Sequence, residues 1–151
     1  MSDQATNPAG RRSCVVSSSA APRHLKRLRE WFVAEWGEVD SLEGQRESTT
    51  ILPPLLAIDS SELLGGLMFS SFQKPDGEAL GLWINALFVA REHRRKGIAS
   101  QLVRAAEAEV ACAGARELFA LTDVPRLYQK LGWRCMKNSS EGTVVGALLK
   151  G

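Results

Sequence analysis

The residues whose types and spacing suggest chemistry form a short basic turn between an apolar run and a helix-like segment. The apolar run ends at Val89, three cations follow at residues 94–96, and Gly97 opens the next segment. Such a turn directs backbone N–H groups outward at a helix N-terminus, where the helix dipole favours an anion. Gly97 has no side chain, so a ligand can approach the backbone closely. The pattern therefore predicts a phosphate or pyrophosphate site.

The turn does not match two common phosphate-binding patterns. No second glycine follows two positions after Gly97, as a dinucleotide-binding fold would require, and no Gly-Lys-Ser/Thr of a Walker-type loop occurs. Two alternatives are a solvated basic turn and a nucleic-acid contact made by Arg91, Arg94, Arg95 and Lys96. The net charge of +2 and the lack of interleaved aromatic residues argue against nucleic acid.

Composition indicates one soluble domain. The chain has 151 residues, of which 44% are hydrophobic and 24% charged, enough for a sizeable core. Residues 1–12 are polar and are predicted to be a mobile tail, which leaves residues 13–151 as the domain. No apolar run approaches the roughly 20 residues that span a membrane, so no membrane partner is expected.

The cysteines favour a reducing compartment. They are odd in number and widely spaced, so a disulfide framework or a zinc site is not expected and the cytoplasm fits best. We expect Cys112 and Cys135 to pack as small apolar residues. Aromatic residues at helical spacing are usually core, so Trp31 and Trp36 are expected to be buried, as is Trp133. The alternative for Trp31, Trp36 and Trp83 is a place in an acceptor cleft.

Hydrophobic periodicity and turn signals predict the order of the elements. Strands are expected at residues 13–18, 55–58, 63–72, 80–89, 118–122, 133–137 and 143–149, and helices at 22–36, 98–113 and 125–130. The three consecutive strands before Val89 predict an antiparallel meander. The strand–helix–strand unit that follows implies a parallel crossover. The expected fold class is therefore α/β (α+β), with a mixed, mostly antiparallel sheet flanked by helices.

A second motif follows the strand at residues 118–122. It reads Leu-Tyr-Gln-Lys-Leu-Gly-Trp over residues 127–133, and the basic turn reads Arg-Arg-Lys-Gly-Ile-Ala over residues 94–99. Together, and in this order, these motifs resemble those of the GNAT family of N-acetyltransferases. The resemblance covers the chain from about Ser13 to the end. It implies a GNAT-like fold in which acetyl-CoA is the cosubstrate and no metal takes part.

The resemblance also implies which residues hold acetyl-CoA. In the family, the amides of the turn face the pyrophosphate, and the strand before it splays from its neighbour and pairs its backbone with the pantetheine arm. The corresponding residues here are Leu87, Phe88, Val89, Arg94, Arg95, Lys96, Gly97, Ile98, Ala99 and Ser100.

Tyr128 is the only tyrosine of the chain. In the family, a tyrosine at this position lies near the CoA sulfur and protonates the departing thiolate, so the resemblance implies that Tyr128 is catalytic. A phenol with a pKa near 10 can donate to a thiolate of about that basicity. The alternative is a helix residue that packs its ring and exposes its hydroxyl.

The general base has no clear candidate. Some relatives use a glutamate on the central strand, but this strand has Asn85 and no acid. Asp123 is a weak candidate, and Glu92 and His93 are expected to be solvated. A water chain, or an acceptor that arrives as the free amine, is an equal alternative.

The resemblance implies direct transfer of an acetyl group to a primary amine of a small molecule or peptide. The alternative is a non-catalytic acyl-CoA-binding or sensor module. In the family, residues 38–54 and 136–150 usually shape the acceptor site, and neither segment carries a motif that names the acceptor. Many relatives dimerise, and a homodimer is compatible with this sequence, although nothing in it requires one.

Overall fold

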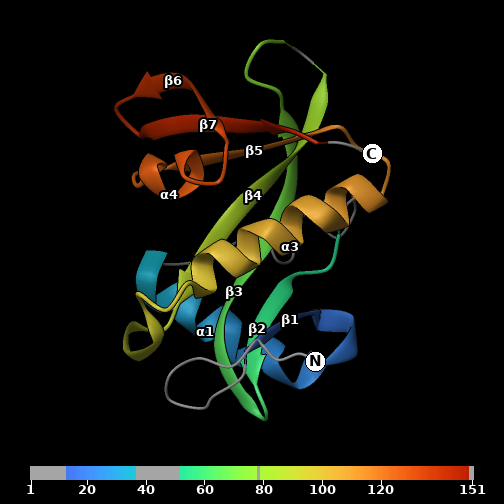
Figure 1. The fold of residues 1–151 in the computed structure, drawn as a ribbon, viewed down its shortest axis with the longest axis vertical. Helices are drawn as coiled ribbons and strands as arrows, with labels where there is room; N and C mark the ends of the chain where they lie inside the picture. The colour runs from blue at the N-terminus through green and yellow to red at the C-terminus, as the bar shows by residue number, and fades with distance from the viewer. Residues whose placement is uncertain (1–12, 37–51, 78, 150–151) are drawn as a thin grey trace.

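A computed structural model describes residues 13–36, 52–77 and 79–149. Its described strands form one seven-stranded sheet in the order β1-β2-β3-β4-β5-β7-β6 (Figure 1). They are β1 (Cys14–Ser17), β2 (Leu55–Asp59), β3 (Glu62–Gln73), β4 (Leu80–Val89), β5 (Glu117–Thr122), β6 (Arg134–Ser139) and β7 (Gly142–Leu148). The α-helices are α1 (Leu25–Trp36), α3 (Ile98–Cys112) and α4 (Pro125–Gln129), and short 3₁₀ turns occupy Ser18–Ala20, Pro22–His24 and Arg91–His93. The predicted tail at residues 1–12 and most of the segment 38–54 lie outside the described residues.

The sheet confirms the predicted topology. β2, β3 and β4 are antiparallel neighbours, and β4 connects through α3 to β5, which lies parallel to it. The fold is therefore a single α+β domain with a mostly antiparallel sheet. The last hairpin adds a feature that its sequence does not specify. β7 pairs with β5, and β6 forms the edge of the sheet.

Two hydrophobic clusters cover opposite faces of the sheet. Leu55 and Ala57 pack in the cluster that contains the apolar side of α3, whereas Leu56, between them, packs with Leu28 and Phe32 of α1. Successive side chains of a strand point to opposite faces. α3 and α1 therefore lie on opposite sides of the sheet, and α3 crosses the front of the view in Figure 1.

The predicted stripe of α3 is buried as expected. Ile98, Leu102, Ala106 and Val110 recur at the spacing of one helix face, and none of the four is more than 4% exposed. Gly114 follows the helix with a φ of +94°, the left-handed conformation in which glycine commonly ends helices. This packing fixes the N-terminal end of α3 beside the end of β4, where the predicted site lies.

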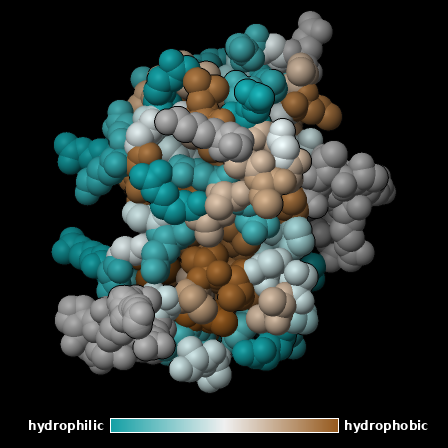
Figure 2. Space-filling model, turned by 45° about the vertical axis from the view of Figure 1, so that its right-hand side comes forward, coloured by the Kyte–Doolittle hydropathy of each residue, from teal (hydrophilic) through white to brown (hydrophobic). Residues whose placement is uncertain are grey.

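The molecular surface is partly apolar. Figure 2 shows a face covered mainly by hydrophilic and intermediate side chains, with its largest hydrophobic area in the lower half and smaller ones elsewhere. Scattered apolar surface is normal for a folded chain. None of the described helices combines the length and apolar character that crossing a bilayer requires.

Three expectations about burial are wrong. Cys112 and Cys135 are exposed, because Cys112 ends its helix and Cys135 lies on the edge strand. Trp36 is 52% exposed, because it is the last residue of α1. His93 is 4% exposed, because its 3₁₀ turn folds its ring against β3. By contrast, Trp133 is buried as predicted.

His24 provides a prediction about stability. Its side chain is buried, and its Nε2 has no hydrogen-bond partner among the described residues. Burial, with a smaller effect of Arg23, lowers the pKa of His24. The unfolded chain therefore binds this proton more tightly than the folded chain, so stability falls as pH drops through about 6.5 and below. We expect the melting temperature to decrease between pH 7.5 and 5.5, and to decrease less in His24→Leu. If the melting temperatures of the two proteins fall equally over this pH range, His24 does not cause the loss of stability.

Candidate active site

The strands β4 and β5 separate within the sheet. Their parallel register contains only Trp83 opposite Phe119 and Ile84 opposite Ala120. Beyond these pairs, β4 continues from residue 85 to 89 with no register partner on β5. The other edge of β5 pairs with β7 along its whole length. The backbone of β4 along this stretch is therefore available on its β5 side. This is the splayed arrangement that the resemblance implied for Leu87, Phe88 and Val89.

A β-bulge lies where the strands part. On β3, Met68 pairs with Ala86 and Phe69 pairs with Ile84, so Asn85 is the extra residue of β4. A bulge bends its strand and increases the local twist. The bulge at Asn85 therefore gives a local reason for β4 to turn away from β5.

The N-terminus of α3 is open to a ligand. Gly97 is its N-cap, with a φ of +81°, and neither a capping side chain nor an acidic residue occupies the first turn. The first N–H groups of a helix lack intrahelical partners, and the helix dipole makes this end attractive to anions. A Cβ built on Gly97 would meet no protein atom within 4 Å, so the space beside this backbone is empty. The first turn has the form of a phosphate cradle.

A cavity of about 480 Å³ connects this turn to the end of β4. It brings together nine of the ten residues predicted to hold acetyl-CoA, from both elements: Leu87, Phe88, Val89, Arg94, Arg95, Gly97, Ile98, Ala99 and Ser100. Lys96 is the exception, since it is exposed and lies outside the cavity lining. The cavity joins an exposed strand backbone to an anion-binding helix end, and it suits a long molecule with a phosphate group.

The basic turn is itself held in place. Arg94 donates from Nε to the carbonyl oxygen of Val89 at 2.7 Å, and its guanidinium lies 5.3 Å from the ring centre of Phe88. Arg95 adopts a left-handed φ of +67°, which is uncommon for a residue with a side chain. Arg94 therefore fixes the turn to the end of β4, a role that its sequence does not reveal.

Tyr128 is buried in the core on α4. Its ring centre lies 4.8 Å from that of Trp133, and 3% of the residue is exposed. Burial raises the pKa of Tyr128, so its phenol is protonated at neutral pH. The preceding residue, Leu127, lines the cavity, whereas Tyr128 is not among the described lining residues.

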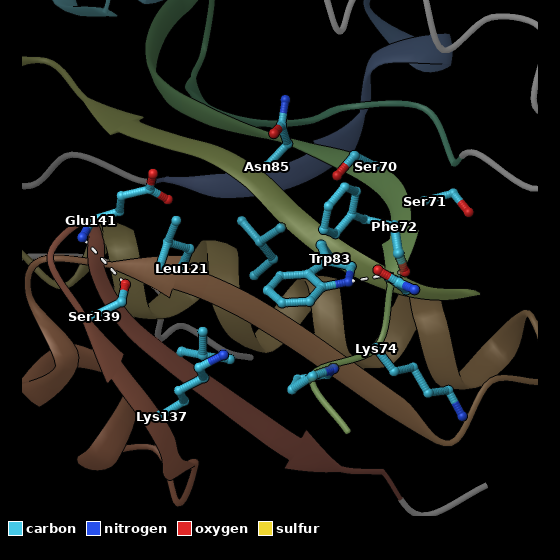
Figure 3. A pocket seen from close by; sticks show the side chains of 14 residues that line it. Ser70, Ser71, Phe72, Lys74, Trp83, Asn85, Leu121, Lys137, Ser139 and Glu141 are labelled. Carbon is cyan, nitrogen blue, oxygen red and sulfur yellow. Dashed lines mark hydrogen bonds between the residues drawn. The ribbon is translucent and has the colours of Figure 1, made fainter. Parts of the chain in front are cut away.

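A second cavity, of about 590 Å³, lies on the sheet face opposite α3. Its lining includes Ser70, Phe72, Trp83, Asn85, Leu121 and Glu141. Figure 3 shows Trp83 between Ser70 and Asn85 on one side and Lys137, Ser139 and Glu141 of the β6–β7 hairpin on the other. Leu87, which lies two residues after Asn85 on β4, lines the first cavity. The two cavities therefore lie on either side of the point where β4 and β5 part.

Of the candidates for a general base, Asp123 and Glu92 lie outside both cavities, whereas His93 lines the first cavity. Asp123 is exposed after β5, and Glu92 is exposed in the basic turn. The Nε2 of His93 lies 3.1 Å from Oε2 of Glu62, which ties the turn to β3. Of the described residues that line the second cavity, only Glu141 is acidic.

Exposed apolar side chains mark both cavities. Trp36 and Val124 line the first, and Phe72 and Leu121 line the second, although all four are exposed. Exposed apolar groups that gather in a hollow are typical of binding sites. The sequence analysis missed Val124, Phe72 and Leu121, whereas Trp36 was offered as an alternative for an acceptor cleft. The only signal for Phe72 and Leu121 was their position near the ends of β3 and β5, the two strands that flank β4.

Solved structures share this fold. Arabidopsis thaliana NAA60 in complex with acetyl-CoA has a TM-score of 0.70 and 18% identity, covering 92% of this chain and 99% of that one. An aminoglycoside 6'-N-acetyltransferase complexed with coenzyme A has a TM-score of 0.69 and 18% identity, with 91% and 97% covered. Arabidopsis thaliana Naa50 with the bisubstrate analogue CoA-Ac-MVNAL has a TM-score of 0.67 and 16% identity, with 89% and 97% covered.

Sequence comparison identifies the family. No curated protein matches the sequence. The profile of the Acetyltransferase (GNAT) family matches residues 25–133, which span α1, the open strand pair, the basic turn, α3 and α4. The chain therefore belongs to the GNAT family of acetyltransferases.

Proposed function

We propose that this protein transfers an acetyl group directly from acetyl-CoA to a primary amine of a small molecule or peptide. The observation that carries the proposal is that two cavities line successive stretches of β4, one as far as Asn85 and the other from Leu87, where β4 leaves β5. One cavity suits the cosubstrate and the other an acceptor, so the two reactants can meet at the gap. The amine nitrogen forms a bond to the acetyl carbon, the carbon–sulfur bond breaks, and the amine loses one proton while the thiolate gains one.

The first cavity supplies two kinds of contact to acetyl-CoA. The amides of the first turn of α3, around Gly97, hold the pyrophosphate through hydrogen bonds and the helix dipole. The main chain of residues 87–89 pairs with the pantetheine arm. Arg95 and Lys96, both exposed, add positive charge near the phosphates. These groups bind and orient, which is the main contribution of a protein to direct transfer between two substrates.

Tyr128 completes the transfer as a proton donor. Its raised pKa keeps the phenol protonated until charge develops on the leaving sulfur. Its neighbours Val124 and Leu127 line the cavity and place α4 beside the reacting end of the site.

The acceptor enters the second cavity as a free amine. The described lining of this cavity contains no imidazole and one carboxylate, Glu141. An acceptor that arrives as the free amine needs no strong base before attack, and water can take the proton that it loses afterwards. The similar structures include a complex with a peptide-containing bisubstrate analogue and an aminoglycoside acetyltransferase, so the fold alone does not choose between peptide and small-molecule amines.

Release of free CoA tests the proposal. The purified protein is mixed with acetyl-CoA and a panel of amines that includes peptides, amino acid amides, spermidine and an aminoglycoside. We expect thiol release that depends on both the protein and an amine, together with an acetylated product in the mass spectrum. Binding of acetyl-CoA in a calorimeter without release for any amine would support the binding or sensor module instead.

A further inference from the structure

The second cavity is lined by a serine hydroxyl with no partner among the described residues. Ser70 is only 6% exposed, and no hydrogen bond joins its hydroxyl to any described residue. The hydroxyl oxygen is not among the buried atoms that lack a partner, so it is accessible from the cavity. The Asn85 side chain, at the bulge on the neighbouring strand, is also without a partner among the described residues. This end of the cavity therefore offers two uncharged groups that can both donate and accept.

The middle of the cavity is a rigid aromatic surface. The indole of Trp83 donates from Nε1 to the carbonyl oxygen of Phe72 at 3.2 Å, which fixes its orientation (Figure 3). Its ring centre lies 5.3 Å from that of Phe119 below it and 6.0 Å from that of Phe72. Phe72 is 62% exposed and Leu121 is 47% exposed beside this surface. An apolar group of a ligand would bury these side chains at little conformational cost.

The charges of the cavity do not suit a polycation. Its described lining contains two lysines and one acid, Glu141. The Nζ of Lys74 lies 2.8 Å from Oε1 of Glu117. Lys137 and Glu141 both lie on the β6–β7 hairpin, where the positive charge of one offsets the negative charge of the other. A polyamine or an aminoglycoside carries several positive charges and would need several carboxylates to offset their desolvation. The cavity fits an acceptor with at most one charge.

The ionisation of the acceptor narrows its class further. A lysine-type amine has a pKa of about 10.4, whereas an α-amino group has one of about 7.7–8.0. A substantial fraction of an α-amine is therefore free base near neutral pH. Because the described lining contains no imidazole and a single carboxylate, Glu141, an acceptor that is already a free amine has the advantage, and an α-amine reacts here more readily than a lysine-type amine.

We infer that the second cavity binds the N-terminal residue of a peptide, or an amino acid amide, whose side chain is apolar. Ser70 and Asn85 hydrogen-bond the amide group next to the α-amine. Phe72, Trp83 and Leu121 contact the apolar side chain. This inference rests on the proposed acetyl transfer and names its acceptor class.

Two exposed residues on paired strands make a matched test. Phe72 and Leu80 lie on the β3–β4 hairpin and are 62% and 69% exposed, but only Phe72 lines the cavity. Phe72→Ser and Leu80→Ser are compared by CoA release with tripeptide amides that begin with leucine, phenylalanine, glycine or aspartate. Spermidine, an aminoglycoside and a blocked lysine complete the panel. We expect the apolar peptides to be preferred at least tenfold in kcat/KM, and Phe72→Ser to raise their KM about tenfold. Leu80→Ser should match the parent protein.

Ser70→Ala tests the polar end of the cavity separately. It removes one hydroxyl, so we expect the KM for the apolar peptide to rise about threefold to tenfold, while the KM for acetyl-CoA stays unchanged. A preference for a polycation or for the lysine side chain would overturn the inference and leave acetyl transfer intact. Equal activity of Phe72→Ser and Leu80→Ser would do the same. Absence of CoA release with every amine would instead overturn the proposed function, and the inference with it.

Discussion

We expect Tyr128→Phe to lower kcat about 100-fold, with little change in the KM for acetyl-CoA. Removing a general acid typically costs about 10² to 10⁴ in rate, because the leaving group must depart without its proton. The substitution keeps the ring, whose centre lies 4.8 Å from that of Trp133, and removes only the hydroxyl. Steady-state CoA release, measured with acetyl-CoA and amine varied separately, gives both constants.

The control is the stability of the variant. Because the ring and its packing are retained, the melting temperature should stay close to that of the parent protein. An unchanged kcat in a folded variant would rule out proton donation by Tyr128 and leave it as a packing residue. A loss that appears only in the KM for acetyl-CoA would indicate a binding role.

The largest effect on cosubstrate binding is expected from Ser100→Asp. Ser100 lies in the first turn of α3 and lines the first cavity. At roughly 6 Å and an effective dielectric constant of about 20, two unit charges repel by about 2.8 kcal/mol. The dissociation constant of acetyl-CoA should therefore rise about 100-fold, as measured by isothermal titration calorimetry. Ser100→Asn, which has the same shape without the charge, should change it far less.

The same substitution should not destabilise the protein. A carboxylate in the first turn of a helix interacts favourably with the helix dipole, by about 0.3–1 kcal/mol. No acidic residue occupies this turn in the parent chain. We therefore expect Ser100→Asp to keep or slightly raise the melting temperature while it weakens acetyl-CoA binding. A lower melting temperature together with weak binding would indicate damage to the fold rather than repulsion of the pyrophosphate.

Local patterns were sufficient for most of the fold. The stripe from Ile98 to Val110 predicted both α3 and its buried face, because one helix turn relates these residues whatever surrounds them. Gly97 and Gly114 marked the ends of the helix, and both adopt positive φ. The strand–helix–strand order then required a parallel crossover.

Burial was harder to predict wherever it depends on contacts distant in sequence. Trp36 continues the apolar spacing of α1, yet it is exposed because the helix ends there beside a cavity. Cys135 follows the buried Trp133, but the strand it enters is the sheet edge. His93 appears solvated among charged neighbours, and only the approach of Glu62 on β3 reveals its burial.

The sequence by itself determined the basic turn, the glycine that begins α3 and the tyrosine of α4, because each is a short motif whose chemistry is local. Only the tertiary structure decided where β4 leaves β5, since the register of two strands and the bulge at Asn85 are pairings between distant segments. It also brought Ser70, Trp83 and Leu121 to one cavity. These residues come from three strands, and side chains on neighbouring strands share a face only after the register is set.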